Sequence, residues 1–278
     1  MSTSRKFTSY VTIVGLICLT SLLVTVDRRI PNPQEKRCSF PVLTSTAQYR
    51  QYISSKQTTC ENWAQLGGWL AAPKDGRKMM CLDERFDIQA GKCVVLSFGV
   101  NNEWSFEDDA EKLGCKVYAF DPTMGMDDHQ RTPNIQFFKL GISDVEGEKK
   151  IGMNPVATDF NFHKAFPVDR YENIVRRLGL EGRVIDIVKM DIELSELDVL
   201  RDLLDDSPHF LRNINQLSIE IHHDYLLGDF GPNSTVRKFW PLYHRLRCHG
   251  FSIMNSKVNL YWQEVVWGRD TAGIPLTE

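Results

Sequence analysis

The sequence predicts an α/β fold, in which a mostly parallel sheet carries helices on both faces and follows one N-terminal transmembrane helix. Two observations support this prediction. Short apolar runs alternate with amphipathic segments along the chain after residue 90, which is typical of the strand–helix units that build a parallel sheet. An uncharged stretch also runs from Phe7 to Val26. Twenty helical residues rise about 30 Å, which is one hydrocarbon thickness.

Composition and charge narrow the class of protein. The 278 residues are 42% hydrophobic and 25% charged, which excludes a collagen-like or wholly disordered chain. There are 33 basic and 36 acidic residues, so the net charge is −3. A general nucleic-acid binder usually carries an excess of basic residues, because neutralisation of phosphates drives its affinity. We therefore expect no nucleic-acid partner.

The N-terminal stretch is expected to be a signal anchor that makes the membrane a partner of the chain. Residues 1–6 would form a short cytosolic tail and residues 7–26 the transmembrane helix. The end of the stretch, Leu22–Val26, is a poor cleavage site. A retained anchor is therefore favoured over a cleaved signal peptide or a buried soluble helix. Residues 27–45, with three prolines, are expected to be a stem or linker before a domain at 46–278.

Cysteine usage and one sequon favour a lumenal or extracellular domain. Cys18 lies in the anchor, and six cysteines follow it, namely Cys38, Cys60, Cys81, Cys93, Cys115 and Cys248. An even number beyond a membrane segment suits the oxidising secretory pathway, with the Golgi as one candidate organelle. Asn233 begins an Asn-Ser-Thr sequon and is the expected glycosylation site. The disulfide pairing stays open, a Cys81–Cys93 loop included. A secreted protein and a cytosolic domain with free thiols are the alternatives.

The elements of the domain follow from periodicity. Residues 46–70 have a broken helical pattern, which predicts one or two short helices that include Tyr49 and Trp63. Apolar runs then predict strands at 93–98, 115–120, 135–140, 184–190 and 216–221, and a final strand pair at 251–255 and 260–267. Helices are expected at 105–113, 171–178, after Ser195, and at 235–248.

Three of these strands end on residues that suit a nucleoside cofactor. In an open α/β sheet, ligands bind at the carboxyl ends of the strands. Gly99 follows the first strand and permits close approach of a ligand, and Asp121 follows the second, where a carboxylate can accept both hydroxyls of a ribose. The alternative for Asp121 is a turn residue before Pro122. A G-x-G-x-x-G motif, which a dinucleotide would need, is missing, so S-adenosyl-L-methionine fits better.

The fourth strand ends in Lys189-Met190-Asp191-Ile192-Glu193, the sharpest motif of the chain. Asp191 and Glu193 are two residues apart and share one side of an extended chain, where they would hold a cationic sulfonium or amino group. The alternative is an ion pair with Lys189. The fifth strand brings His222, a candidate general base, and a surface turn with two histidines is the alternative.

A zinc site formed by His222, His223 and Asp191 is a weaker alternative. These residues lack the ligand spacing that is typical of zinc. We therefore expect no metal site.

These motifs together resemble a known family. The segments Ser97–Gly99, Trp104–Glu107, Ala119–Pro122 and Lys189–Glu193 are similar to the methyltransferase-like protein 24 group, which is related to the FkbM-type methyltransferases. The resemblance spans roughly residues 75–268 and implies a class I, Rossmann-like methyltransferase with a seven-strand sheet and S-adenosyl-L-methionine as cofactor. The common Asp-Ile-Glu-Gly-x-Glu pattern has Leu194 in place of glycine here.

The resemblance also assigns roles to residues. Phe98, Gly99 and Asn101 would lie along the cofactor, Asp121 would bind the ribose, and Asp144 would lie near the adenine. Asp191 would lie near the methionine end. Apart from the resemblance, Asp191 is our candidate catalytic residue and His222 is our candidate base for an oxygen acceptor. The acceptor itself, whether glycan, protein or small molecule, is not implied.

Two other functional classes remain open. A tail, one anchor, a stem and a lumenal domain is also the plan of Golgi glycosyltransferases, and Asp191-x-Glu193 can imitate their Asp-x-Asp metal motif. The third class is an inactive methyltransferase fold that acts as a binding module.

Overall fold

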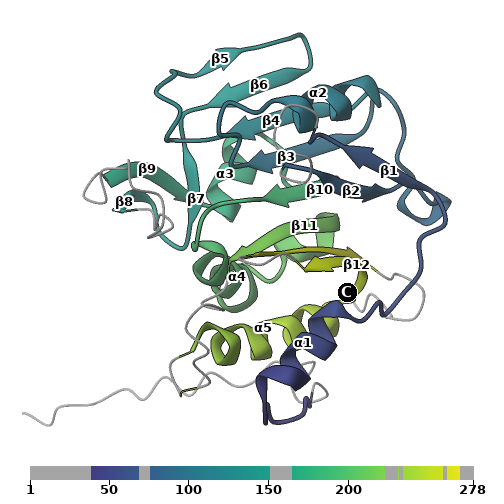
Figure 1. The fold of residues 1–278 in the computed structure, drawn as a ribbon. Coiled ribbons are helices and arrows are strands. Elements are labelled where there is room, and N and C mark those ends of the chain that lie inside the picture. The colour runs from purple at the N-terminus through teal and green to yellow at the C-terminus, as the bar shows by residue number, and fades with distance from the viewer. Residues whose placement is uncertain are drawn as a thin grey trace, which may run out of the picture.

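The computed structural model describes residues 39–68, 76–150, 165–222, 231, 234–258 and 262–269. At its centre is an eight-stranded sheet with the order β12-β13-β11-β10-β3-β4-β6-β5 (Figure 1). The strands are β3 (Val94–Phe98), β4 (Lys116–Phe120), β5 (His129–Gln130), β6 (Ile135–Phe138), β10 (Ile185–Met190), β11 (Ile214–His222), β12 (Phe251–Val258) and β13 (Trp262–Arg269).

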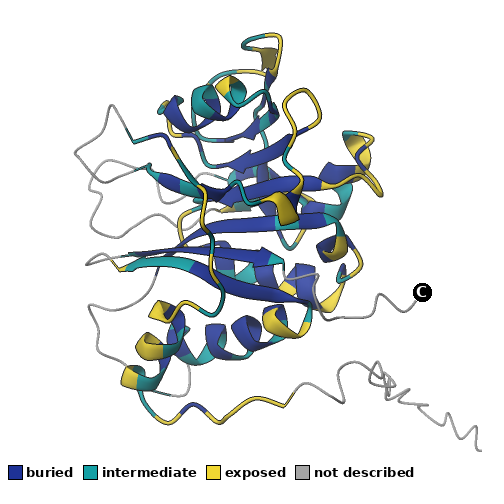
Figure 2. Cartoon of the chain, turned by 90° about the vertical axis from the view of Figure 1, so that its right-hand side faces the viewer, coloured by how far each residue is buried: buried dark blue, intermediate teal, exposed yellow. Residues whose placement is uncertain are grey.

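Five neighbouring strands are parallel, which confirms the predicted α/β class. β11, β10, β3, β4 and β6 pair in parallel, whereas β13, β12 and β5 join them in antiparallel fashion. Every residue of β3 and of β10 is buried, as expected for central strands covered on both faces. Figure 2 shows the strands of the sheet mostly buried, with exposed residues on the helices and connecting loops. All seven expected strands are present in this sheet, and its further strand, the two-residue β5, was not expected.

The helices cover both faces of the sheet. They are α1 (Thr46–Ser54), α2 (Ser105–Lys112), α3 (Tyr171–Arg177), α4 (Glu196–Asp205) and α5 (Thr235–Cys248). Alternate residues of β3 enter different clusters, since Leu96 belongs to the cluster that includes residues of α1, α3, α4 and α5, and Val95 belongs to the cluster that includes residues of α2. Ser195 precedes α4, but its side chain makes no capping hydrogen bond.

Smaller elements complete the described part of the chain. A two-stranded sheet pairs β1 (Trp63–Leu66) with β2 (Lys78–Cys81), and a three-stranded sheet joins β7 (Gly141–Ser143), β9 (Ala165–Arg170) and β8 (Gly147–Lys150). Two short 3-10 turns lie at Glu84–Phe86 and Phe210–Asn213. The expectation of a helix around Trp63 is wrong. Ala64 and Leu66 pack with α2, so this segment serves as an extended cover for the sheet.

Two disulfides tie the elements that support the central strands. Cys60 is bonded to Cys81 of β2, and Cys93 is bonded to Cys115, so the second bond links the residues that precede β3 and β4. Cys248 is disulfide-bonded as well. The expected alternative of a Cys81–Cys93 loop is therefore wrong.

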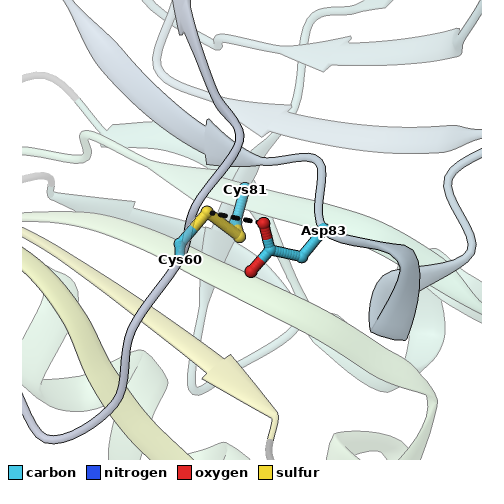
Figure 3. A group of neighbouring side chains, drawn as sticks. All are labelled: Cys60, Cys81 and Asp83. Carbon is cyan, nitrogen blue, oxygen red and sulfur yellow. Dashed lines mark hydrogen bonds between the residues drawn. A yellow bond between two sulfur atoms is a disulfide. The ribbon is translucent and has the colours of Figure 1, made fainter.

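The Cys60–Cys81 disulfide lies beside the carboxylate of Asp83, which joins two segments of the chain by hydrogen bonds. Figure 3 shows the side chain of Asp83 beside the Cys60–Cys81 bond. The carboxylate of Asp83 accepts the backbone N–H groups of Glu61 and Asn62, at 3.0 and 2.9 Å. Because Cys60 and Cys81 are oxidised, their sulfurs are not thiolate ligands, and the group holds two chain segments together.

The expected tail and anchor, residues 1–26, lie outside the described residues, as does the stem up to Cys38. Within the described ranges, no helix is both long enough and apolar enough to cross a bilayer.

Candidate functional site

The order of the parallel strands creates a switch point between β3 and β10. From β3 the chain moves outward to β4 and β6, and it then returns to place β10 and β11 on the other side of β3 (Figure 1). At such a point the crossovers leave in opposite directions, and a crevice opens at the carboxyl ends of the two strands. Phe98 is the register partner of Met190, so Gly99 and Asp191 follow their strands side by side.

The chain at this point requires glycine. Gly99 has a φ of +84°, and a Cβ at this position would lie 1.7 Å from the carbonyl oxygen of Asp191. The N–H of Asp191 donates to the carbonyl of Phe98 at 3.0 Å, and the ammonium of Lys189 donates to the carbonyl of Gly99. The predicted junction of the two strand ends is therefore present and closely packed.

Asp121 holds the loop that follows Gly99. It is buried, with 4% of its surface exposed. One carboxylate oxygen accepts the N–H groups of Val100 and Asn101, at 2.9 and 2.8 Å, and the other accepts the N–H and the hydroxyl of Thr123, at 2.8 and 2.6 Å. Because both oxygens are engaged, Asp121 shapes the backbone beside Gly99. Its contact with a ribose stays a prediction.

Three further predicted cofactor residues take different positions. Phe98 is buried and its ring stacks on Phe120, with the ring centroids 4.8 Å apart, so its side chain belongs to the core. Asn101 is exposed on the loop with a φ of +49°. Asp144 follows β7 and accepts a hydrogen bond from Lys149 at 2.6 Å, and Lys149 also reaches Asp198 of α4. Their roles toward a cofactor stay predictions.

A buried lysine that the sequence reasoning missed reaches the same edge of the sheet. The side chain of Lys78 on β2 has no exposed surface, and its ammonium lies 2.6 Å from Glu220, 3.4 Å from Asp191, and in contact with Glu264. Glu220 and Glu264 are register partners on β11 and β13. The side-chain amide of Gln216 exchanges two hydrogen bonds with the backbone of Cys81, at 2.8 Å each, which fixes β2 over β11. The sequence does contain a signal for this network, namely a charged residue inside a short apolar segment: Lys78 in β2, Glu220 in β11 and Glu264 in β13.

Burial and charge set the protonation of this network. Burial raises the pKa of Glu220 to about 9, although the charge of Lys78 opposes this. Burial acts against the ionised form of Asp191 too, but the nearby charges of Lys78, Lys189 and His222 lower its pKa below the usual value. Asp191 therefore stays ionised beside Gly99, whereas Glu220 tends to take up a proton.

His222 is buried, so the alternative of a surface turn is wrong for this residue. Its Nδ1 hydrogen-bonds to the carboxylate of Glu196 at 2.8 Å, and its Nε2 lies 3.5 Å from Glu193 and 3.6 Å from Glu220. Burial opposes the charged form, but the hydrogen bond and the charges of Glu196 and Glu193 raise the pKa of His222 to about 9. A protonated imidazole accepts no proton, so the predicted general-base role requires His222 to lose its proton first. His223 and Asn233 lie outside the described residues.

The loop after β10 has a left-handed backbone. Glu193 and Leu194 have φ values of +48° and +68°, which are uncommon for residues with a side chain. Leu194 stands where the resembled pattern has glycine, and it adopts a conformation that glycine favours, with 40% of its surface exposed. The loop therefore turns sharply and directs Glu193 back toward His222.

This loop and β11 bring together side chains that can bind a metal ion. One potential ligand atom from each of Asp191, Glu193 and His222 lies within 4.8 Å of the other two. The expectation of no metal site rested on the spacing of His222, His223 and Asp191 along the sequence, and spacing does not report on Glu193.

Comparison with known proteins gives one family. Residues 30–267 match the family model described as a methyltransferase domain. Among curated protein sequences, none matches the chain significantly.

Several solved structures are similar to the chain. The fibrillarin pre-rRNA processing protein of Methanococcus jannaschii has a TM-score of 0.36 and 11% identity, over 65% of this chain and 67% of that one. The 1,6-didemethyltoxoflavin-N1-methyltransferase of Burkholderia thailandensis has a TM-score of 0.32 and 13% identity, over 67% and 74%. A mutant 16S rRNA (adenine(1408)-N(1))-methyltransferase from Catenulisporales acidiphilia has a TM-score of 0.32 and 14% identity, over 74% and 98%.

Proposed function

The chain belongs to the methyltransferase domain family, and from this premise we propose that it binds S-adenosyl-L-methionine at the carboxyl ends of β3, β4 and β10. The observation that carries the proposal is the packing of Gly99 against Asp191 at the switch point of the sheet. The family implies this methyl donor. The lack of a pyrophosphate-binding glycine motif also favours S-adenosyl-L-methionine over a dinucleotide.

The proposed reaction is a direct transfer. A lone pair on an oxygen or nitrogen of the acceptor attacks the methyl carbon, the carbon–sulfur bond breaks, and its electron pair stays on sulfur to give S-adenosylhomocysteine. The acceptor atom releases its proton to a base or to solvent. The protein would mainly align the two reactants. The ionised Asp191 at the junction would stabilise the positively charged sulfonium or amino group of the donor before transfer.

Replacing Asp121 with alanine is expected to weaken binding of S-adenosylhomocysteine by about 100-fold. The change leaves the N–H groups of Val100, Asn101 and Thr123 without their acceptor, and hydrogen bonds to a charged group contribute about 1.5–3 kcal/mol each. Calorimetric titration of the full chain measures the effect. Asp127→Ala is the matched control, because the side chain of this aspartate is exposed and pairs with Lys139 on the surface. An affinity equal to that of the control would refute the site.

The same sample separates the other two functional classes. A thermal shift with S-adenosylhomocysteine supports the proposal. A shift with a UDP-sugar and Mn²⁺ instead would support the glycosyltransferase alternative, and no shift with either would support a binding module without activity.

We further propose that the finer assignment to the methyltransferase-like protein 24 group is correct, and that the domain is held in the lumen of the secretory pathway by an anchor at residues 7–26. The apolar stretch and the disulfides at Cys60–Cys81 and Cys93–Cys115 support this location, since such bonds persist in oxidising compartments.

Glycosylation tests the location. When the full chain is synthesised with microsomes, treatment with an endoglycosidase is expected to lower its apparent mass by one N-linked glycan. Asn233→Gln is expected to abolish this change in mass. Asn255→Gln is the control, because Asn255 begins no sequon. A chain that carries no glycan and is digested by protease added outside the microsomes would contradict the lumenal location.

A further inference from the structure

Three side chains converge beyond the ends of two neighbouring strands. Asp191 and Glu193 follow β10, and His222 is the last residue of β11. Their ligand atoms lie within 4.8 Å of one another. Carboxylate oxygens and imidazole nitrogens bind a metal ion at about 2.0–2.2 Å, so two ligands of one ion are at most about 4.4 Å apart. Side-chain movements of a few tenths of an ångström would therefore complete the geometry.

The imidazole of His222 is oriented as a metal ligand would be. Its side chain is nine-tenths buried, and Nδ1 is held by Glu196, a fully buried residue in the first turn of α4. Metal-binding histidines commonly use their second ring nitrogen in such a hydrogen bond to a carboxylate, which fixes the ring. Nε2 points among carboxylates at 3.5 and 3.6 Å, which is too far for a hydrogen bond. Nε2 is therefore the ring nitrogen that faces Glu193 and Glu220, at ion-pair distance rather than in a close hydrogen bond.

The surroundings are rich in carboxyl groups. Asp191, Glu193, Glu196, Glu220 and Glu264 are connected with the ammonium groups of Lys78 and Lys189 and with the imidazole of His222. Lys78 is shared among three acids, and Lys189 is bonded to the carbonyl of Gly99. Carboxylate oxygens bind divalent cations, so a metal ion would join this network as a further cation.

We propose that Asp191, Glu193 and His222 form a site for a divalent metal ion of the manganese or zinc type, next to the proposed donor site. The mixed carboxylate and imidazole set suits these ions. Glu196 would act as the positioning residue for His222.

The role of the ion rests on the proposed function. With three protein ligands, the ion keeps open coordination positions, and one of them would bind a hydroxyl oxygen of the acceptor. Coordination lowers the pKa of that hydroxyl, which releases its proton to solvent. The resulting oxygen attacks the methyl carbon, and the electron pair of the carbon–sulfur bond stays on sulfur. The acceptor class is therefore a hydroxyl compound, and the reaction is O-methylation.

Binding of Mn²⁺ to the purified full chain tests the site. Electron paramagnetic resonance measures the free Mn²⁺ that remains after mixing, and we expect one ion bound per chain. Glu193→Gln is expected to weaken binding at least tenfold, and His222→Gln is a second variant with the same expectation. Glu193 is 49% exposed at its side chain, so the variant should fold. Glu181→Gln, which removes an exposed carboxylate paired with Arg176, is expected to bind as the wild type does.

Parallel titration with S-adenosylhomocysteine separates the two proposals. If the wild type binds S-adenosylhomocysteine but no Mn²⁺, the metal site is refuted and the donor site stands. If it binds Mn²⁺ but no S-adenosylhomocysteine, the metal site stands and the methyl-donor function fails. If Glu193→Gln and Glu181→Gln bind Mn²⁺ as well as the wild type does, the ion lies elsewhere and the metal site is refuted.

Discussion

Replacing Gly99 with alanine is expected to abolish detectable binding of S-adenosylhomocysteine and to lower the free energy of unfolding by about 3 kcal/mol. Two effects add up. The φ of +84° is strained for any residue with a Cβ, and the new methyl group would lie 1.7 Å from the carbonyl oxygen of Asp191. Overpacking of this kind typically costs about 1–3 kcal/mol beyond the strain.

The clash has no simple relief, because both sides are held by hydrogen bonds. The N–H of Gly99 donates to Phe120 at 2.9 Å, and the N–H of Asp191 donates to Phe98 at 3.0 Å. Relief therefore requires the ends of β3 and β10 to separate, which would deform the proposed donor site.

A second glycine variant serves as a control, because it separates the effect of backbone strain from the effect of the steric clash. Gly179 has a φ of +66°, and an added Cβ would meet no atom within 4 Å. Gly179→Ala should cost about 1 kcal/mol and leave affinity unchanged. Urea unfolding and calorimetry measure both quantities. If the two variants behave alike, the packing at the switch point is not as described.

Replacing Lys78 with methionine is expected to destabilise the full chain by about 3–5 kcal/mol at pH 7. The change leaves Glu220, Glu264 and Asp191 without their shared buried cation, and breaking a buried ion pair from one side costs about this much. Lys112→Met is the control, since this exposed lysine pairs with Asp109 on the surface of α2, and it should change stability by less than about 1 kcal/mol.

The loss should depend on pH. Lys78 is the largest of the charges that lower the pKa of Asp191, so without Lys78 that pKa rises. The destabilisation therefore grows as the pH rises through about 4 to 7, and it shrinks in acid. If Lys78→Met proves too unstable to purify, adding Glu264→Gln should restore part of the stability, because one uncompensated charge is removed. Loss of less than 1 kcal/mol in the single variant, or no recovery in the double variant, would contradict the network.

The large elements were predictable because their patterns agree with their environment. The helix expected at 235–248 is α5 (Thr235–Cys248), where an amphipathic run is followed by Gly250. The strand expected at 184–190 is β10, an apolar run that is buried on both faces. Apolar periodicity therefore identified the central sheet, and its strand ends located the switch point.

The elements that were missed carry little local pattern. β2 has four residues and includes a buried lysine, and β9 contains Pro167 and Asp169, which are rare within strands. Their conformations depend on tertiary contacts, such as the hydrogen bonds between Gln216 and Cys81.

Part of the site was predictable because its residues directly follow strands that the sequence predicts. Strand ends indicated Gly99, Asp121 and Asp191, because their place depends on the strand before them. Lys78 and Glu264 could not be inferred, since their contacts join residues 186 positions apart. The hydrogen bonds that Asp121 accepts from Val100 and Asn101 could not be inferred either, because they depend on the folded conformation of the backbone.

The bond between Cys60 and Cys81 has a practical consequence for anyone preparing this enzyme. The four-residue strand that ends at Cys81 also begins with Lys78, so the covalent tether and the buried cation share one rigid piece of chain. Recombinant material from a reducing bacterial cytosol would lack that tether. Turnover assays on such material would examine a loosened edge of the proposed donor site, so an oxidising expression host should come before any screen of acceptors.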